Sequence, residues 1–214
     1  MSAEVFSNFI MSDLGAIVAF ACVLLLGLLL LFFFKKDTKV PLKALTYSAI
    51  CLSIALVLSQ LRIYRMPMGG SITAGSMLFI SLVGYWFGLK PGVLAAISFG
   101  FLRLIFDPFV IHPVQMLLDY PLAYAALGFS GLFRERRYGL IKGYLVGSTG
   151  FLFCTTLSGV LFFSVFFPEG VNVWFYSFLY NITYIGPEVA FSLIILSVPA
   201  IKSVIDRIGI EAGT

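Results

Sequence analysis

The segment at residues 14–34, LGAIVAFACVLLLGLLLLFFF, holds 21 successive residues without a charged side chain. A helix of about 20 apolar residues spans the roughly 30 Å hydrocarbon core of a bilayer. A secretory signal peptide would begin with basic residues and have a shorter apolar run. Here Glu4 and Asp13 precede the run, and Lys35 and Lys36 follow it. The sequence therefore predicts a retained transmembrane helix and an integral membrane protein.

The remainder of the 214-residue chain has the same character, because 60% of all residues are hydrophobic and only 11% are charged. Pro and Gly interrupt the apolar segments at short intervals and mark the expected turns. We expect an all-α, polytopic membrane helix bundle. The extra N-terminal transmembrane helix and a basic cytoplasmic linker occupy residues 1–40, and a six-helix domain occupies residues 41–214. The six helices are expected at about 41–61, 71–89, 91–106, 113–133, 140–166 and 172–201.

The distribution of basic residues predicts the orientation, because cytoplasmic loops are enriched in Lys and Arg. With the N-terminus outside and the C-terminus in the cytoplasm, 11 of the 14 basic residues lie inside. The loops at 62–70, 107–112 and 167–171 are then extracellular. The inner basic residues are Lys35, Lys36, Lys39, Lys43, Lys90, Arg134, Arg136, Arg137, Lys142, Lys202 and Arg207, and the outer ones are Arg62, Arg65 and Arg103.

Four ionisable residues lie within or beside the apolar segments, namely Arg103, His112, Asp119 and Glu188. A charge at mid-helix costs about 2.5–3.5 kcal/mol on insertion scales, so such residues face a partner or a cavity. Asp119 forms either an internal ion pair, for example with Arg103, or the counter-charge of a cationic ligand. Glu188 is either a second ligand carboxylate or, as we expect, a residue that satisfies backbone groups freed by Pro187 or pairs with Arg103. His112 is expected to cap or shape the turn into the next helix.

Aromatic residues favour the ligand interpretation of Asp119. Tyr120 is adjacent to it, and WFYSFLYN places Trp174, Tyr176 and Tyr180 at the outer start of the last helix, followed by Asn181. Aromatic faces attract organic cations, and an amide offers a donor and an acceptor at fixed geometry. An interfacial aromatic belt is the alternative; it accounts for Trp174 but not for a buried amide.

No nucleophile–base arrangement and no phosphate-binding glycine motif occurs in the sequence. We therefore expect neither an enzyme nor a protein that hydrolyses ATP by itself. One histidine and three unpaired cysteines predict no metal site, and a net charge of +4 reports membrane topology rather than nucleic-acid binding. A secondary transporter or channel, a membrane enzyme and a structural scaffold remain as alternatives to a ligand-binding transport subunit.

Three segments in order resemble one known family: RMPMGGSITAGSM (65–77), FVIHPVQMLLDYPLAYAALGFSGLF (109–133) and FYSFLYNITYIGPE (175–188). Together with the helix at 46–59 they are similar to the thiamine-specific substrate-binding (S) component of energy-coupling factor (ECF) transporters. The resemblance covers residues 41–205. It implies a six-helix membrane protein of the prokaryotic plasma membrane that binds thiamine from outside with high affinity and needs no cofactor. It also implies docking, within the lipid, onto a transmembrane coupling (T) component and two cytoplasmic ATPases that power uptake.

The resemblance places ligand-binding roles on particular residues. The acidic residue and its aromatic neighbour fall on Asp119 and Tyr120, and the stacking tyrosine and the amide fall on Tyr176 and Asn181. Further expected ligand-binding positions are Gly159, Thr155 and Trp174. Thr155 stands where the family usually has histidine, and Phe163 where it often has tryptophan. These departures leave a thiamine precursor or a related organic cation as an alternative ligand.

The same resemblance predicts a gate and a docking face. The loop at 62–70 matches the gate between the first two helices of the family, with Tyr64, Met66, Gly69 and Gly70 as its expected residues. Ala49 and Ser53, small residues four positions apart, fall on the face that docks the coupling component. Close approach of membrane helices requires such small residues. The helix at 14–34 is either a plain anchor or a partner-binding helix.

Overall fold

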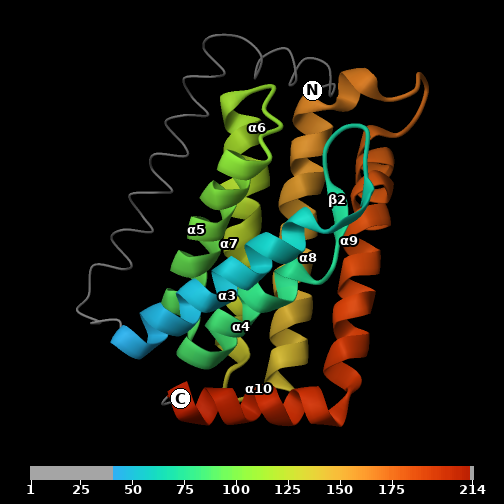
Figure 1. Cartoon of the computed structure of the whole chain (residues 1–214). Coiled ribbons are helices and arrows are strands. Elements are labelled where there is room, and N and C mark those ends of the chain that lie inside the picture. The colour runs from blue at the N-terminus through green and yellow to red at the C-terminus, as the bar shows by residue number, and fades with distance from the viewer. Residues whose placement is uncertain (1–40, 213–214) are drawn as a thin grey trace.

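The computed structural model describes residues 41–212 of the chain. Five helical segments in this part are long and apolar enough to cross a membrane, and Figure 1 shows them as a bundle. They are α3 (Leu42–Gln60), α5 (Leu89–Phe106), the segment Pro113–Phe133, α8 (Gly139–Phe162, extended by η3, Ser164–Phe166) and α9 (Val173–Ser197). A shorter apolar helix, α4 (Ser76–Phe87), lies between α3 and α5 in the sequence. The expected helix at 14–34 lies outside the described residues.

The six helices predicted for residues 41–201 are all present, but their borders differ in three places. The helix expected from residue 71 begins at Ser76, because Ser71–Thr73 form a strand. Gly88, at φ +88°, ends α4 and α5 begins at once, so the break precedes the predicted KPG turn at 90–92. The last predicted helix is two helices, because α9 ends at Ser197 and Pro199 starts the separate α10 (Pro199–Ala212). Proline is well suited to the first turn of a helix and cannot continue the preceding one.

The segment Pro113–Phe133 is helical throughout but irregular. It consists of α6 (Pro113–Leu117), the π-helical turn η1 (Leu118–Leu122), α7 (Ala123–Leu127) and the 3-10 helix η2 (Gly128–Phe133). Pro121 lies inside the π-helical turn and has no N–H to donate to the regular ladder. Wide turns of this kind often occur at functional sites, and this one carries Asp119.

The loop predicted at 62–70 is instead part of a short β-hairpin, so the expectation of an exclusively helical fold is wrong at this point. Strand β1 (Arg62–Arg65) pairs antiparallel with β2 (Ser71–Thr73). Gly69 and Gly70 have φ values of +83° and +81° and form the turn, in which the Met66 N–H donates to the Gly70 carbonyl at 3.1 Å. Glycine adopts positive φ values far more readily than other residues, which explains two adjacent glycines in this turn.

Glycines allow the helices to approach closely in the lower half of the bundle. A Cβ atom added to Gly92 on α5 would lie 2.5 Å from the Gly84 Cα on α4 and 2.9 Å from the Gly128 carbonyl oxygen on η2. Nearby, the Ser130 hydroxyl donates to the Ser81 carbonyl at 2.6 Å. Small residues and an interhelical hydrogen bond replace the hydrophobic driving force that is absent between helices in lipid.

Helix α10 lies across the lower end of the bundle in Figure 1. It is amphipathic and buries Ile205, Gly209 and Ala212. Two hydrogen bonds fasten it: the Trp86 indole N–H donates to the Ile205 carbonyl at 3.1 Å, and the Lys43 ammonium donates to the Glu211 carbonyl at 3.3 Å. The lower end is therefore closed by a helix, whereas the hairpin lies beside α9 in the upper half of the bundle (Figure 1).

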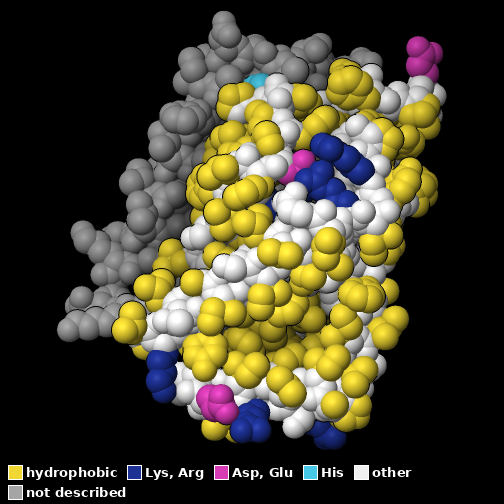
Figure 2. Space-filling model, viewed as in Figure 1, with side chains coloured by type: hydrophobic (Ala, Val, Ile, Leu, Met, Phe, Trp, Pro, Cys, Tyr) yellow, Lys and Arg dark blue, Asp and Glu magenta, His cyan; other side chains and the backbone are white. Residues whose placement is uncertain are grey.

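The surface of the bundle agrees with a membrane location. Figure 2 shows mostly hydrophobic side chains over the middle of the visible face, with charged side chains at the lower end. A second group of basic side chains, next to an acidic one, lies in the upper half.

We predict that Gly92→Ala lowers the thermal stability of the purified protein, because the added methyl group has no space against Gly84 and Gly128. Overpacking costs about 1–3 kcal/mol, and we expect a clear fall in the melting temperature measured by differential scanning fluorimetry. Gly186→Ala in α9 is the matched control, since its nearest neighbour would be an Ile182 side-chain carbon at 3.7 Å. Equal melting temperatures for the two variants would contradict this packing.

Candidate ligand-binding site

A cavity of about 130 Å³ lies between the hairpin, α5, η1, α8 and α9. Its lining is mixed, with tyrosine rings, hydroxyl groups and both signs of charge. Seven of the residues predicted for the ligand or the gate line it: Asp119, Tyr120, Thr155, Gly159, Asn181, Gly69 and Gly70. Segments far apart in the sequence thus meet where the sequence analysis expected a site.

Asp119 is partly buried on η1 and lines the cavity. One carboxylate oxygen accepts a hydrogen bond of 2.6 Å from the Gln115 amide, which lies one turn earlier. Gln115 is itself fixed to the loop before α6, because its amide also donates to the Phe109 carbonyl at 3.0 Å and its oxygen accepts from the Ile111 N–H at 3.1 Å. The carboxylate is held in place by a neutral group.

The alternative of an Asp119–Arg103 ion pair is wrong. The Arg103 guanidinium pairs with Asp107, one turn later on the same helix, at 3.0 Å. Within the part of the chain that the structure describes, Asp119 forms no ion pair. Its charge is therefore available to a molecule in the cavity.

Tyr120 joins η1 to the loop at 107–112. Its hydroxyl accepts from the Phe109 N–H at 2.7 Å and donates to the Asp107 carbonyl at 2.9 Å. Because both polar functions of the hydroxyl are used, the ring is fixed, and its face is the part that a ligand can contact.

Asn181 on α9 is buried between α8 and α9. Its amide donates to the Ser177 carbonyl at 2.9 Å and to the Thr155 carbonyl at 3.3 Å, and its oxygen accepts from the Tyr184 hydroxyl at 2.7 Å. The Thr155 hydroxyl donates to carbonyls of its own helix. A side chain at Gly159 would collide with the Ser177 hydroxyl, so glycine permits this contact. In this arrangement Asn181 orients Tyr184 and its own amide is already occupied.

Four predicted residues do not line the cavity. Trp174 and Tyr64 are more than half exposed. Tyr176 packs on Phe167, with 4.5 Å between ring centroids, and Met66 packs against the core. Trp174 shares the face of Ser177 and Asn181, but it lies in the exposed first turn of α9.

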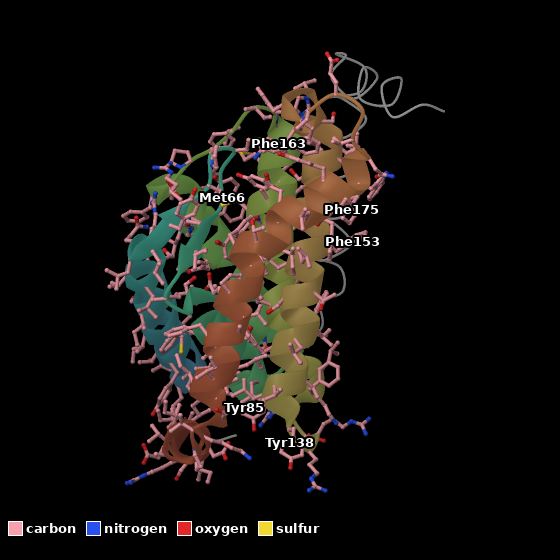
Figure 3. All side chains as sticks on the ribbon, turned by 90° about the vertical axis from the view of Figure 1, so that its right-hand side faces the viewer. Met66, Tyr85, Tyr138, Phe153, Phe163 and Phe175 are labelled. Atoms are coloured by element: carbon pink, nitrogen blue, oxygen red, sulfur yellow. The ribbon has the colours of Figure 1, made fainter. Side chains whose placement is uncertain are left out.

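Figure 3 shows how labelled side chains divide between the two ends of the bundle. Met66 and Phe163 lie toward the hairpin end, and Tyr85 and Tyr138 lie at the opposite end. Phe163, which stands where the related family often has tryptophan, lines the cavity and stacks on Phe109 with 5.9 Å between ring centroids. This position is therefore part of the site in spite of the substitution.

The sequence analysis counted Tyr180 among the aromatic residues of the last helix but gave it no ligand or gate role. Its hydroxyl accepts from the Met68 N–H at 2.9 Å and donates to the Gly69 carbonyl at 3.0 Å, so it ties the tip of the hairpin to α9. Tyr184 was missed; a Cβ atom at Gly70 would lie 2.8 Å from its ring. The available signal was the spacing from Asn181, since positions 177, 180, 181 and 184 share one helical face.

Glu188 has a structural role that the sequence analysis did not anticipate. Its carboxylate accepts from the Thr73 hydroxyl at 2.6 Å, the Ser76 hydroxyl at 3.0 Å and the Met77 N–H at 3.0 Å. It caps the start of α4 and holds β2, so both expected roles, relief of Pro187 and a pair with Arg103, are wrong. A carboxylate is well placed at a helix N-terminus.

The predicted capping role of His112 is confirmed. Its Nδ1 accepts from the Val114 N–H at 3.1 Å at the start of α6. Burial lowers the pKa of this imidazole, which favours the neutral form that can accept. Among the described residues, no cluster of His, Cys, Asp or Glu could hold a metal ion.

Comparison with known proteins decides the family. A family model described as thiamine transporter protein matches residues 45–206. The chain belongs to the thiamine transporter protein family. Thiamine transporter ThiT of Bacillus subtilis is 37% identical over 145 residues, covering 61% of this chain and 75% of that protein. ThiT of Lacticaseibacillus paracasei is 32% identical over 111 residues, covering 44% of this chain and 55% of that protein. This is a family of multi-pass membrane transporters rather than enzymes, and the resemblance noted from the sequence is confirmed.

Solved structures support the fold of this thiamine transporter family member. ThiT from Listeria monocytogenes matches with a TM-score of 0.64 at 22% identity, covering 75% of this chain and 93% of that one. The S-component for biotin from an ECF-type ABC transporter matches with a TM-score of 0.54 at 20% identity, covering 78% and 90%. The helical bundle is therefore of the S-component type.

We predict that Tyr180→Phe loosens the hairpin without disturbing α9. The change removes two hydrogen bonds to Met68 and Gly69, each worth about 1 kcal/mol, so amide exchange at the hairpin tip should become at least about fivefold faster. Hydrogen–deuterium exchange followed by mass spectrometry measures this. Tyr176→Phe on the same helix is the matched control and should leave the exchange unaltered; if both variants behave alike, Tyr180 does not hold the hairpin.

Proposed function

We propose that the chain is the high-affinity thiamine-binding S-component of an ATP-driven ECF uptake transporter. The observation that carries the proposal is the carboxylate of Asp119, which forms no ion pair with any described residue and borders a tyrosine-lined cavity. Membership of the thiamine transporter protein family identifies the cation. A site for a neutral solute would have no use for an uncompensated carboxylate at this depth.

Thiamine carries a fixed positive charge on its thiazolium ring and has a flat pyrimidine ring. We propose that Asp119 balances the charge, with Gln115 keeping the carboxylate directed into the cavity. Tyr120 and Tyr184 present aromatic faces to the rings by cation–π and stacking contacts. Asn181 acts through Tyr184, and Thr155 and Gly159 set the spacing of α8 from α9. Tyr176 and Trp174 are then assigned to the surroundings of the site rather than to ligand contact.

The hairpin is proposed to be the gate. It covers the cavity, and it is held by Tyr180 on α9 and by ion pairs from Arg62 and Arg65 to Asp107 at 3.2 and 3.3 Å. Gly69 and Gly70 allow the backbone at the tip to change conformation. Opening this lid would admit the ligand, and closing it would exclude water and strengthen each polar contact.

The hairpin end is proposed to face outside. At the opposite end the described residues include eight basic side chains, against Arg62, Arg65 and Arg103 at the hairpin end, and this asymmetry favours the cytoplasm at the α10 end. The eight are Lys43, Lys90, Arg134, Arg136, Arg137, Lys142, Lys202 and Arg207.

The energy for uptake is proposed to come from partners, since the sequence has no phosphate-binding motif of its own. A T component and two ATPases are implied by the ECF relationship.

Ala49 and Ser53 are both exposed on α3, one helical turn apart, and the Ser53 hydroxyl donates to the Ala49 carbonyl at 2.8 Å. This small, internally satisfied face is suited to close contact with a membrane helix of the T component.

We predict that Asp119→Asn weakens thiamine binding strongly, because it removes the counter-charge while keeping the size of the side chain. Loss of a buried charge partner costs about 3–5 kcal/mol, so the Kd should rise at least about 100-fold. Isothermal titration calorimetry on the purified protein measures this. Glu169→Gln in the loop at 167–171, away from the cavity, is the control for a lost carboxylate, and wild-type affinity in Asp119→Asn would reject the proposed role.

We predict that Ala49→Phe abolishes ATP-dependent thiamine uptake but not thiamine binding. The large side chain would separate α3 from the T component, whereas Ala49 does not line the cavity. Uptake in proteoliposomes with the partner proteins is compared with calorimetry on the isolated variant. Ile50→Phe, which enlarges the neighbouring exposed position, is the control; uptake by the isolated chain without ATPases would instead indicate a secondary transporter.

A further inference from the structure

Two cations share one tyrosine ring at the α10 end of the bundle. The Arg137 guanidinium carbon lies 5.2 Å from the centroid of the Tyr138 ring, and the Lys202 ammonium nitrogen lies 5.6 Å from it. Arg137 belongs to the turn before α8, whereas Lys202 belongs to α10. Two positive charges this close to one ring repel each other, so an anion within reach of both would be stabilised.

The protein itself does not neutralise these two cations. Both side chains are exposed, and neither of them forms an ion pair within residues 41–212. Two acids are near in sequence, Glu135 in the same turn and Asp206 one turn later on α10, but neither pairs with them. Arg207, by contrast, pairs with Glu211 on the same helix at 3.2 Å.

The backbone at Tyr138 has an unusual conformation. Its φ is +58°, in the left-handed region that is costly for residues other than glycine. A tight turn imposes this conformation, because the Arg136 N–H donates to the Phe133 carbonyl at 2.9 Å and a Cβ atom at Gly139 would collide with the same carbonyl. Strained backbone often marks a functional site, and here it fixes a ring that is 55% exposed.

Apolar side chains adjoin the two cations. Val198, one turn before Lys202, is 41% exposed, and Leu145, two turns after Tyr138 on α8, is 40% exposed. Tyrosine is enriched where a membrane meets water, and Figure 3 shows Tyr138 at the end of the bundle away from Phe163. A molecule with a charged head and apolar chains matches this combination of cations, ring and apolar surface.

We propose that Arg137, Lys202 and Tyr138 bind the headgroup of an anionic phospholipid, with its phosphate held by the two cations. Guanidinium and ammonium groups form charge-assisted hydrogen bonds with phosphate, and basic pockets beside membrane helices bind anionic headgroups. None of the three residues lines the ligand cavity, so this site goes beyond the proposed function. In the proposed orientation the lipid belongs to the cytoplasmic leaflet.

A bound lipid would also connect two distant parts of the chain. The turn before α8 and the start of α10 contribute one cation each. A phosphate that engages both cations therefore fastens α10 to the bundle at its exposed side. Without the phosphate, the two cations are held near each other only by their contacts with the ring.

A diffuse attraction to a charged surface makes a different prediction from a defined site. If only the total charge of this end mattered, removal of any one basic side chain would weaken lipid binding equally. If the site is at Tyr138, the position of the lost charge decides the effect. Loss of the ring would then weaken binding although the net charge is unchanged.

The test is native mass spectrometry of the full chain in detergent, with phosphatidylglycerol and phosphatidylcholine added in equal amounts. The wild type should retain phosphatidylglycerol preferentially. Arg137→Gln and Lys202→Gln should each lower the affinity for phosphatidylglycerol about fivefold, which corresponds to about 1 kcal/mol for one basic side chain near an anionic lipid. Arg207→Gln, which removes the same charge from a paired side chain, is the matched control and should have less than a twofold effect.

A second pair of variants leaves the net charge unchanged. Tyr138→Leu should weaken the retention of phosphatidylglycerol, because the cations lose the ring that positions them. Tyr138→Phe keeps the aromatic face and should behave like the wild type. Thiamine affinity, measured by calorimetry, should be unaltered in all of these variants, so a failure of the lipid site and a failure of thiamine binding are distinguishable.

Several results would overturn the lipid site. Equal retention of the two lipids by the wild type would do so, as would equal losses in Lys202→Gln and Arg207→Gln. Competition by glycerol 3-phosphate at the concentration of the lipid would show a site for free anions instead. Wild-type lipid retention in Lys202→Gln, together with loss of ATP-driven uptake with the partner proteins, would assign the surface to a protein partner. If Lys202→Gln does not fold, the two Tyr138 variants decide.

Discussion

The placement of Arg103 decides what the rest of the site can do. An acid and an arginine in one apolar bundle would normally satisfy each other, because an unpaired charge is costly where water is scarce. Here Asp107, four residues after Arg103, engages the arginine on its own helix. Asp119 is left with the neutral amide of Gln115. The bundle thus keeps Asp119 unpaired with Arg103, although both side chains line the same cavity.

Hydrogen bonds of buried polar groups also hold the hairpin over the cavity. Glu188 joins β2 to the start of α4, and Tyr180 joins the hairpin tip to α9. In a water-poor environment each of these bonds has few competitors. Residues that could be taken for ligand contacts, Glu188 and Asn181 among them, turn out to hold neighbouring segments in position.

Much of the bundle could be predicted because apolar length and Gly/Pro breaks are local signals. Asp119 stood out for the same reason, since an isolated acid in an apolar run is visible without a structure. The hairpin was missed because RIYR is short and gains its pairing from a partner strand. Tyr176 was preferred over Tyr180 because the two lie one turn apart on the same side of α9, and the contacts of Tyr180 with Met68 and Gly69 come from a segment far away in the sequence. The separate α10 was missed because its apolar positions extend those of α9.

The hairpin has only two strands, of four and three residues. A ribbon of this size has little stability alone, so its closed position derives from a few side-chain bonds at its margins. In the proposed gate, opening would leave the described spanning helices intact, and lid motions of this kind occur in microseconds to milliseconds. The residence time of a bound ligand and the stability of the helical bundle are then separate properties. Substitutions in the hairpin contacts can change the residence time without destabilising the helices.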